Sequence, residues 1–318
     1  MKQFLELYQT ILNEGEWQQN RTGIPTIAIS GAMMKYDLAE GFPATTTRKL
    51  PFKTFTGEAL GFLRGYTNAA DFRALGCKVW DQNANENKQW LANPFRMGEN
   101  SLGPIYGDQW RNWKGYRVLS RYHPGFQSAL DAGWSIVGTV DNGVLLYKRI
   151  DQVRDCLDKL VNDPTNRRIL FHGWNPAVLD EVALPACHIA YMFNTNLAKR
   201  ELSMTLWQRS ADTPLGVCGN LTGASIILSL VARLTGFTPR FLTWFGSDVH
   251  IYENQLDMVN EQLKREPFAP PRLVISSRIP AFAETGKYEP EWLEQAEVSD
   301  FSLEGYEHHP PLTAPMAV

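Results

Sequence analysis

The sequence has few cysteines, no strong excess of charge and no long hydrophobic run. Its four cysteines are scattered over 318 residues with no CxxC pair or Cys/His cluster, which argues against a disulfide framework or a structural zinc site. There are 31 Lys and Arg against 34 Asp and Glu, a formal charge of −3, so the chain has no overall attraction for nucleic acid or anionic lipid. Any anion that it binds must be held by a local group of basic residues.

The N-terminal segment carries acidic residues in an amphipathic pattern, whereas a signal peptide has a basic region followed by an apolar run. No stretch approaches the roughly 18 apolar residues of a membrane span. We therefore expect a soluble cytoplasmic protein with no membrane or nucleic-acid partner and no metal. A hydrophobic share of 44% and a charged share of 20% are ordinary for a globular chain of a length that can bury a large core.

Hydrophobic spacing predicts both helices and strands along the chain. Helical spacing covers residues 2–14, 54–66, 150–161, 221–236 and 253–266, and the fourth of these is apolar on nearly all sides, as in a buried helix. Strand patterns cover residues 24–30, 167–174, 187–194 and 201–208. Residues 87–149 are rich in turn signals, including a hairpin signal at Asp141-Asn142-Gly143, and we expect an insertion there. The pattern indicates a single α+β domain over residues 1–318.

Cys187 is a candidate nucleophile. It begins a predicted strand and precedes a polar group that contains Arg209. A thiol attacks carbon only as the thiolate, and a nearby guanidinium favours that charged form. The alternative is a small buried apolar residue, because free cysteine is among the residue types most often buried.

Four arginines are candidates for a phosphate cradle, because the guanidinium fork suits phosphate geometry. They are Arg21, Arg209 and the pair Arg167-Arg168 that follows a predicted turn. The pair could equally be exposed arginines on a solvated turn.

Two further groups of side chains have a functional and a structural interpretation. Asp248, His250 and Tyr252 alternate on an extended segment and could hydrogen-bond a sugar, or they could belong to a strand whose histidine is satisfied internally. Trp80 and Tyr106 could stack on a flat ligand, or they could be core aromatics.

In order and spacing, these motifs closely resemble the thymidylate synthase family over the whole chain. The matching segments are RTG at Arg21, GFPATTTRKL, the mid-helix carboxylate Glu58, VWD at Trp80, GxIYGxQWR at Tyr106, RRI at Arg167, CH at Cys187, QRSxD from Gln208 to Asp212, Asn220, and DxHIY from Asp248. The resemblance implies a thymidylate synthase-like fold with a large mixed sheet and packed helices. It also implies a homodimer that packs sheet against sheet, and 5,10-methylenetetrahydrofolate as the co-substrate.

The resemblance also implies a role for each site residue. Cys187 adds to C6 of dUMP, and Arg209 activates the thiolate and binds the phosphate. Asn220 reads the uracil edge, and Glu58 moves protons. The catalytic residues implied are Cys187, Glu58, Tyr106, Arg209, Asp212 and Asn220. Substrate is bound by Arg21, Gln208, Arg209, Ser210, Asn220, His250, Tyr252 and, from the neighbouring subunit, Arg167 and Arg168. Folate is bound by Trp80, Asp212, Gly216 and the closing C-terminus at Val318.

The sequence departs from the family pattern beside the nucleophile and the base reader. Ala186 and Cys218-Gly219 stand where the family has Pro and Pro-Phe, and Ser247 stands where Gly is usual. Loss of an aromatic ring predicts room for a water. We therefore hypothesise that water adds to the methylene intermediate and gives 5-hydroxymethyl-dUMP, as in bacteriophage hydroxymethylases acting in the host cytoplasm.

Two alternatives stay open. One is reduction of the same intermediate to dTMP, with release of dihydrofolate. The other is a non-catalytic nucleotide- or RNA-binding relative. Asn220 indicates dUMP over dCMP, because its amide can donate to the uracil carbonyl whereas the dCMP-specific enzymes carry Asp.

Overall fold

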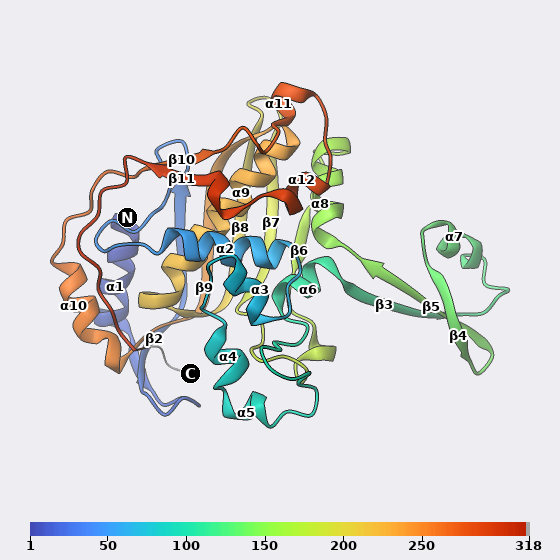
Figure 1. Cartoon of the computed structure of the whole chain (residues 1–318), viewed down its shortest axis with the longest axis horizontal. Helices are drawn as coiled ribbons and strands as arrows, with labels where there is room; N and C mark the ends of the chain where they lie inside the picture. Colours follow the sequence, from blue (N-terminus) through green and yellow to red (C-terminus); the bar gives the residue numbers. More distant parts are fainter. Residues whose placement is uncertain (316–318) are drawn as a thin grey trace.

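The computed structural model describes residues 1–315 and is built on a six-stranded sheet in the order β1-β2-β9-β8-β7-β6 (Figure 1). Val318, expected at a closing tail, lies outside the described residues. The strands are β1 (Glu16–Gln18), β2 (Thr26–Asp37), β9 (Thr238–Tyr252), β8 (Glu201–Asp212), β7 (His188–Asn196) and β6 (Leu170–His172). All neighbours run antiparallel except β8 and β9, which are parallel. The sheet is therefore mixed, as predicted.

Helices cover one face of this sheet and form the core with it. α9 (Cys218–Thr235) packs against β9, β8 and α2 (Phe52–Leu63), while α1 (Lys2–Glu14) packs on β2 (Figure 1). The segment Thr213–Thr235 is long and apolar enough to cross a membrane. Its most apolar stretch of 18 residues has a mean hydropathy of 1.8, but 78% of that stretch is buried in the fold. Such burial is typical of a core helix. It ends at Gly236, whose φ of +77° only glycine adopts readily.

The opposite face of the sheet is apolar, and none of the elements within residues 1–315 covers it. Register places Met33 beside Phe245 and Phe245 beside Trp207 on neighbouring strands. These side chains are 59%, 44% and 53% exposed. Met192 extends the same face on β7 and is 41% exposed. A continuous apolar surface of this kind marks an interaction site.

A separate three-stranded sheet projects from the body within the region predicted as an insertion. It consists of β3 (Trp113–Leu119), β5 (Gly143–Ile150) and β4 (Ser135–Val140), with α7 (Phe126–Asp131) at its outer end (Figure 1). Its own small core contains Ala129, Trp134, Val144 and Leu146. The predicted turn joins β4 to β5, where Asp141 has a φ of +49°.

The remaining elements surround the core. They are α3 (Ala69–Ala74), α4 (Asp81–Asn85), α5 (Lys88–Leu91), α6 (Tyr106–Arg111), α8 (Gln152–Asn162), α10 (Leu256–Leu263), β10 (Arg272–Ile275), α11 (Phe282–Thr285), α12 (Glu291–Gln295) and β11 (Phe301–Glu304). The predicted helices and strands are present, with shifted ends. The helix expected over 54–66 ends at Leu63 because Gly65 turns the chain with a φ of +73°. The strand expected over 167–174 begins only at Leu170, because the Arg168 N–H donates to the Asn166 side chain and not to a neighbouring strand.

Candidate active site

A cleft of about 940 Å³ opens at the end of the main sheet where β7, β8 and β9 meet the start of α9. Its size lies at the upper end of the range for small-molecule pockets, which is roughly 300 to 1,000 Å³. Ten of the residues implied by the family resemblance line it: Arg21, Glu58, Cys187, Arg209, Ser210, Asp212, Gly216, Asn220, His250 and Tyr252. The cleft therefore collects residues that are up to 231 positions apart in the chain (252 − 21 = 231).

Cys187 lies directly before β7 and is held against Arg209 at three points. The Arg209 backbone N–H donates to the Cys187 carbonyl at 2.7 Å, its Nε donates to the Ala186 carbonyl at 3.3 Å, and its Nη2 lies 3.8 Å from the Cys187 Sγ. The guanidinium also lies 5.5 Å from the Trp174 ring, a cation–π distance. The sulfur is half-buried and faces a fixed positive charge, as a thiolate nucleophile requires.

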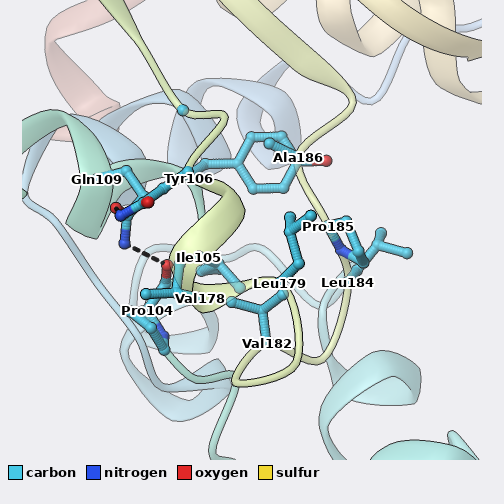
Figure 2. Close-up of a pocket in the computed structure, with 12 residues that line it drawn as sticks. Pro104, Ile105, Tyr106, Gln109, Val178, Leu179, Val182, Leu184, Pro185 and Ala186 are labelled. Carbon is cyan, nitrogen blue, oxygen red and sulfur yellow. Dashed lines mark hydrogen bonds between the residues drawn. The ribbon is translucent and has the colours of Figure 1, made fainter.

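Tyr106 supports the nucleophile from behind. Its hydroxyl accepts the Cys187 backbone N–H at 2.8 Å, and its ring stacks on Phe62 at 4.9 Å between centroids. Burial raises its pKa well above the usual range. Figure 2 shows Tyr106 beside Ala186 in a second hollow, where Gln109 donates to the Pro104 carbonyl. That hollow holds about 10 Å³, room for at most one water, so substrate binds in the larger cleft.

Glu58 is the one carboxylate on the α2 side of the cleft. Burial raises its pKa to about 7, although the Trp80 indole N–H, donating at 3.0 Å, holds it down. Trp80 itself is 4% exposed and packs on Phe62 and Tyr106. The structure thus places Trp80 behind Glu58 and away from the cleft wall, where it positions the carboxylate.

Replacing Trp80 by phenylalanine should raise the pKa of Glu58 by about one to two units, because a hydrogen bond to a charged group is worth about 1.5 to 3 kcal/mol. Glu58 accepts a proton only when ionised, so the acid limb of kcat/KM against pH moves to higher pH. The control is Trp110→Phe, another buried tryptophan that does not line the cleft. Two results would contradict the role of Glu58 as a proton acceptor that Trp80 holds in place. One is an acid limb of the pH profile that does not move in Trp80→Phe, and the other is an acid limb that is still present in Glu58→Gln.

Asn220 is oriented by Gln208. The Gln208 Nε2 donates to Asn220 Oδ1 at 2.8 Å, and the Gln208 Oε1 accepts from the Trp244 indole at 2.8 Å. The Asn220 oxygen is thus engaged from behind, and the Asn220 side chain also hydrogen-bonds the buried His188. Gln208 is buried and does not line the cleft, so it acts through Asn220.

Asp212 ends β8 and is held by two donors. Gln255 Nε2 donates to one carboxylate oxygen at 3.1 Å and the Leu215 N–H to the other at 3.2 Å. Burial raises its pKa despite these bonds. The second contact shapes the π-helical turn Thr213–Val217, which carries the cleft-lining Gly216.

Arg48 is a cleft residue that the motif analysis did not assign, although it lies in the matching segment GFPATTTRKL. Its Nη2 donates to the Pro214 carbonyl and lies 3.1 Å from the Cys218 Sγ. Cys218 therefore packs as a buried thiol against Arg48, and its pKa is raised by burial. The contact ties the turn before α9 to the N-terminal half of the chain.

The space expected beside Gly219 is filled, so the prediction of room for a water there is wrong. A Cβ added to Gly219 would lie 2.4, 2.6 and 2.7 Å from three ring carbons of Phe55. Phe55 comes from α2 and lines the cleft. Ser247, the other departure near the site, is exposed on β9.

The remaining candidates are divided between the cleft and the surface. His250 Nδ1 contacts Asp248 Oδ1 at 3.1 Å, and His250 lines the cleft beside Tyr252. Arg167 and Arg168 are exposed and do not line the cleft of their own chain. Arg21 and Arg209 are the two predicted phosphate arginines that the single chain brings together.

Comparison with known proteins bears on this arrangement. A family model described as Thymidylate synthase matches residues 2–318. The chain belongs to the thymidylate synthase family. Proteins named thymidylate synthase from Pseudomonas putida, Pseudomonas syringae pv. tomato and Bordetella parapertussis are 61%, 58% and 57% identical over 323 residues, covering 100% of both chains in each case. The family resemblance seen in the motifs is confirmed.

The thymidylate synthase relatives also bear on the two fates of the methylene intermediate. All three carry the name of the reductive enzyme and come from bacteria. They support the alternative, reduction to dTMP, over our preferred hypothesis of hydroxymethylation. The expectation of a bacteriophage hydroxymethylase receives no support from them.

Proposed function

We propose that this enzyme converts dUMP to dTMP by reductive transfer of a one-carbon unit from 5,10-methylenetetrahydrofolate, in the cytoplasm. The observation that carries the proposal is the Cys187 sulfur held 3.8 Å from the Arg209 guanidinium inside a cleft that also contains Glu58 and Asn220. The full-length thymidylate synthase relatives favour reduction as the outcome.

In the proposed mechanism the chain binds, orients and moves protons. Arg21, Arg209 and Ser210 hold the phosphate, and the Asn220 amide donates to the uracil carbonyl. The Cys187 thiolate bonds to C6 and makes C5 nucleophilic. Glu58, with a pKa of about 7, exchanges protons with the pyrimidine at neutral pH. Tyr106, whose hydroxyl accepts from the Cys187 N–H, positions the nucleophile.

The part of the cleft beyond the nucleotide fits a folate. Trp90, Leu215 and Val182 give it an apolar wall, and Asp212 offers a buried carboxylate to a ring N–H. The folate supplies the one-carbon unit and the hydride. Among the described residues no group of three or more His, Cys, Asp or Glu is placed to hold a metal ion.

A homodimer completes the proposed site. The uncovered apolar face of Met33, Trp207 and Phe245 provides a surface on which a second copy can pack sheet to sheet. Arg167 and Arg168, exposed and outside their own cleft, are then available to the phosphate in the neighbouring subunit. The four-arginine phosphate cradle is thus drawn from two chains.

An absorbance assay tests the proposed function. With dUMP and 5,10-methylenetetrahydrofolate, we expect dihydrofolate to form in step with consumption of dUMP. Consumption of dUMP without dihydrofolate would contradict reduction, because hydration returns tetrahydrofolate.

Replacing Asn220 by aspartate should raise the kcat/KM for dCMP relative to that for dUMP by about 10²-fold, because a carboxylate accepts from the cytosine amino group and cannot donate to the uracil carbonyl. Gln208 still has an oxygen to which it can donate. The control is Asn260→Asp on the exposed side of α10. An unchanged ratio refutes the base-reading role.

A further inference from the structure

Phe55 packs between the two helices that carry Glu58 and Asn220. It lies on α2, three residues before Glu58, and its ring meets Gly219, the residue directly before Asn220 on α9 (Figure 1 shows the two helices). The 2.4 to 2.7 Å separation between its ring carbons and a Cβ built on Gly219 is too short for two real atoms. The ring therefore occupies the volume that any side chain at position 219 needs.

The two helices remain in contact one turn further along the crossing. A Cβ on Gly223 would lie 3.6 Å from the Ala59 Cβ, which is ordinary contact, so a side chain is sterically excluded at position 219 and not at position 223. Glycine is unfavourable inside a helix, and the close approach of the Phe55 ring gives a reason for it at position 219.

The Phe55 ring also borders the reaction space. It lines the cleft together with Cys187 and Asn220, and it is only partly buried by the protein. Two polar groups that can partner a water line the same cleft, namely the Glu58 carboxylate and the Asn220 amide. A gap at Phe55 would thus be polar enough on one side to hold water.

We propose that Phe55 is a specificity-determining residue that excludes water from the pyrimidine end of the cleft and so directs the intermediate to reduction. This inference rests on the proposed function. The aromatic ring at the Gly219 side of the cleft comes from Phe55 on α2. The residue at position 219 on α9 is glycine, which leaves space for that ring.

The two outcomes differ in what reaches the one-carbon unit on C5. In reduction, a hydride forms the new C–H bond and tetrahydrofolate is oxidised to dihydrofolate. In hydration, the oxygen of water forms a C–O bond, its proton passes to solvent, and nothing is oxidised. In both outcomes, the electron pair of the exocyclic double bond between C5 and the methylene carbon moves to form the C5–C6 double bond. The C6–S bond breaks in the same step, and Cys187 leaves as the thiolate.

The test compares four full-length proteins: the wild type, Phe55→Ala, Gly219→Phe and the double variant. Products are quantified by mass spectrometry of the nucleotide, together with dihydrofolate. We expect Phe55→Ala to raise the ratio of 5-hydroxymethyl-dUMP to dTMP by about tenfold or more. Gly219→Phe alone should lose stability and activity, because its ring has no space. The double variant should return the ratio toward that of the wild type, with the ring now supplied from α9.

Phe52→Ala is the matched control. Phe52 is also on α2 and packs on Phe42 at 5.8 Å between ring centroids, but it does not line the cleft. It should lower stability and leave the product ratio unchanged. If Phe55→Ala does not fold, Phe55→Leu, which removes less volume, should raise the ratio to a smaller extent.

Three results overturn the proposal. A folded Phe55→Ala or Phe55→Leu that keeps the wild-type ratio contradicts it and leaves the proposed function intact. An equal rise in the ratio of 5-hydroxymethyl-dUMP to dTMP in Phe52→Ala also contradicts the proposal, because the effect would then come from a general loosening of α2. Hydroxymethyl product from the wild type itself contradicts both the proposed function and water exclusion by Phe55, so the two failures are distinguishable.

Discussion

Replacing Cys187 by alanine should lower kcat on the order of 10⁴-fold or more, while binding of dUMP is retained. The reason is that the sulfur forms the bond to C6, whereas the phosphate and the uracil edge are held by other side chains. Alanine is smaller than cysteine and the position is half-buried, so the fold should tolerate it. Single-turnover assays measure the loss, and equilibrium titration with dUMP measures the retained binding.

Cys156→Ala is the matched control for this substitution. Cys156 is a free thiol buried in α8, outside the cleft. We expect it to lower the free energy of unfolding by about 1 kcal/mol and to leave turnover unchanged. Turnover that survives in Cys187→Ala shows that the bond to C6 is made by another group.

Replacing Arg209 by glutamine should lower kcat/KM about 10³-fold, with both kcat and the KM for dUMP affected. The guanidinium lies 3.8 Å from the Cys187 sulfur and, in the proposed mechanism, binds the phosphate, and glutamine carries no charge for either contact. The backbone bond to the Cys187 carbonyl does not depend on the side chain, so the strand pairing persists. Alkylation of Cys187 by iodoacetamide gives a second readout, which should slow because the positive charge 3.8 Å from the sulfur is lost.

Arg121→Gln is the control for charge, because Arg121 is exposed in the turn between β3 and α7. It should change neither kcat/KM nor the rate of alkylation. If Arg209→Gln raises only the KM for dUMP and leaves alkylation unchanged, Arg209 binds phosphate without activating the sulfur.

Local signals predicted much of the fold and the chemical groups of the site. Hydrophobic period identified α1, α8 and α9 to within a few residues, because each buries one face or all of its surface. A contact between Cys187 and Arg209 could be anticipated because a nucleophilic thiol needs a nearby guanidinium and Arg209 lies in the next polar group along the chain. The strand β9 was predicted only near its end, because Gly246 and Ser247 interrupt its alternation.

Contacts between distant segments were beyond the reach of local signals. Trp80 has the flat aromatic side chain of a ligand-stacking residue. Only the packing of the folded chain shows that it lies behind Glu58. Gly219 in isolation predicts an empty space, whereas the residue that fills it is 164 positions earlier (219 − 55 = 164). Phe55 lies three residues before Glu58, which places it on the cleft face of α2. The residue that Phe55 contacts depends on how α2 and α9 cross.

The most direct test of the account is the identity of the nucleotide formed by the wild-type enzyme from dUMP and 5,10-methylenetetrahydrofolate. The closed wall at Phe55 and Gly219, together with the relatives named thymidylate synthase, predicts dTMP as the product, accompanied by one dihydrofolate for each dTMP. A mass spectrum dominated by 5-hydroxymethyl-dUMP, with tetrahydrofolate returned unoxidised, would contradict it.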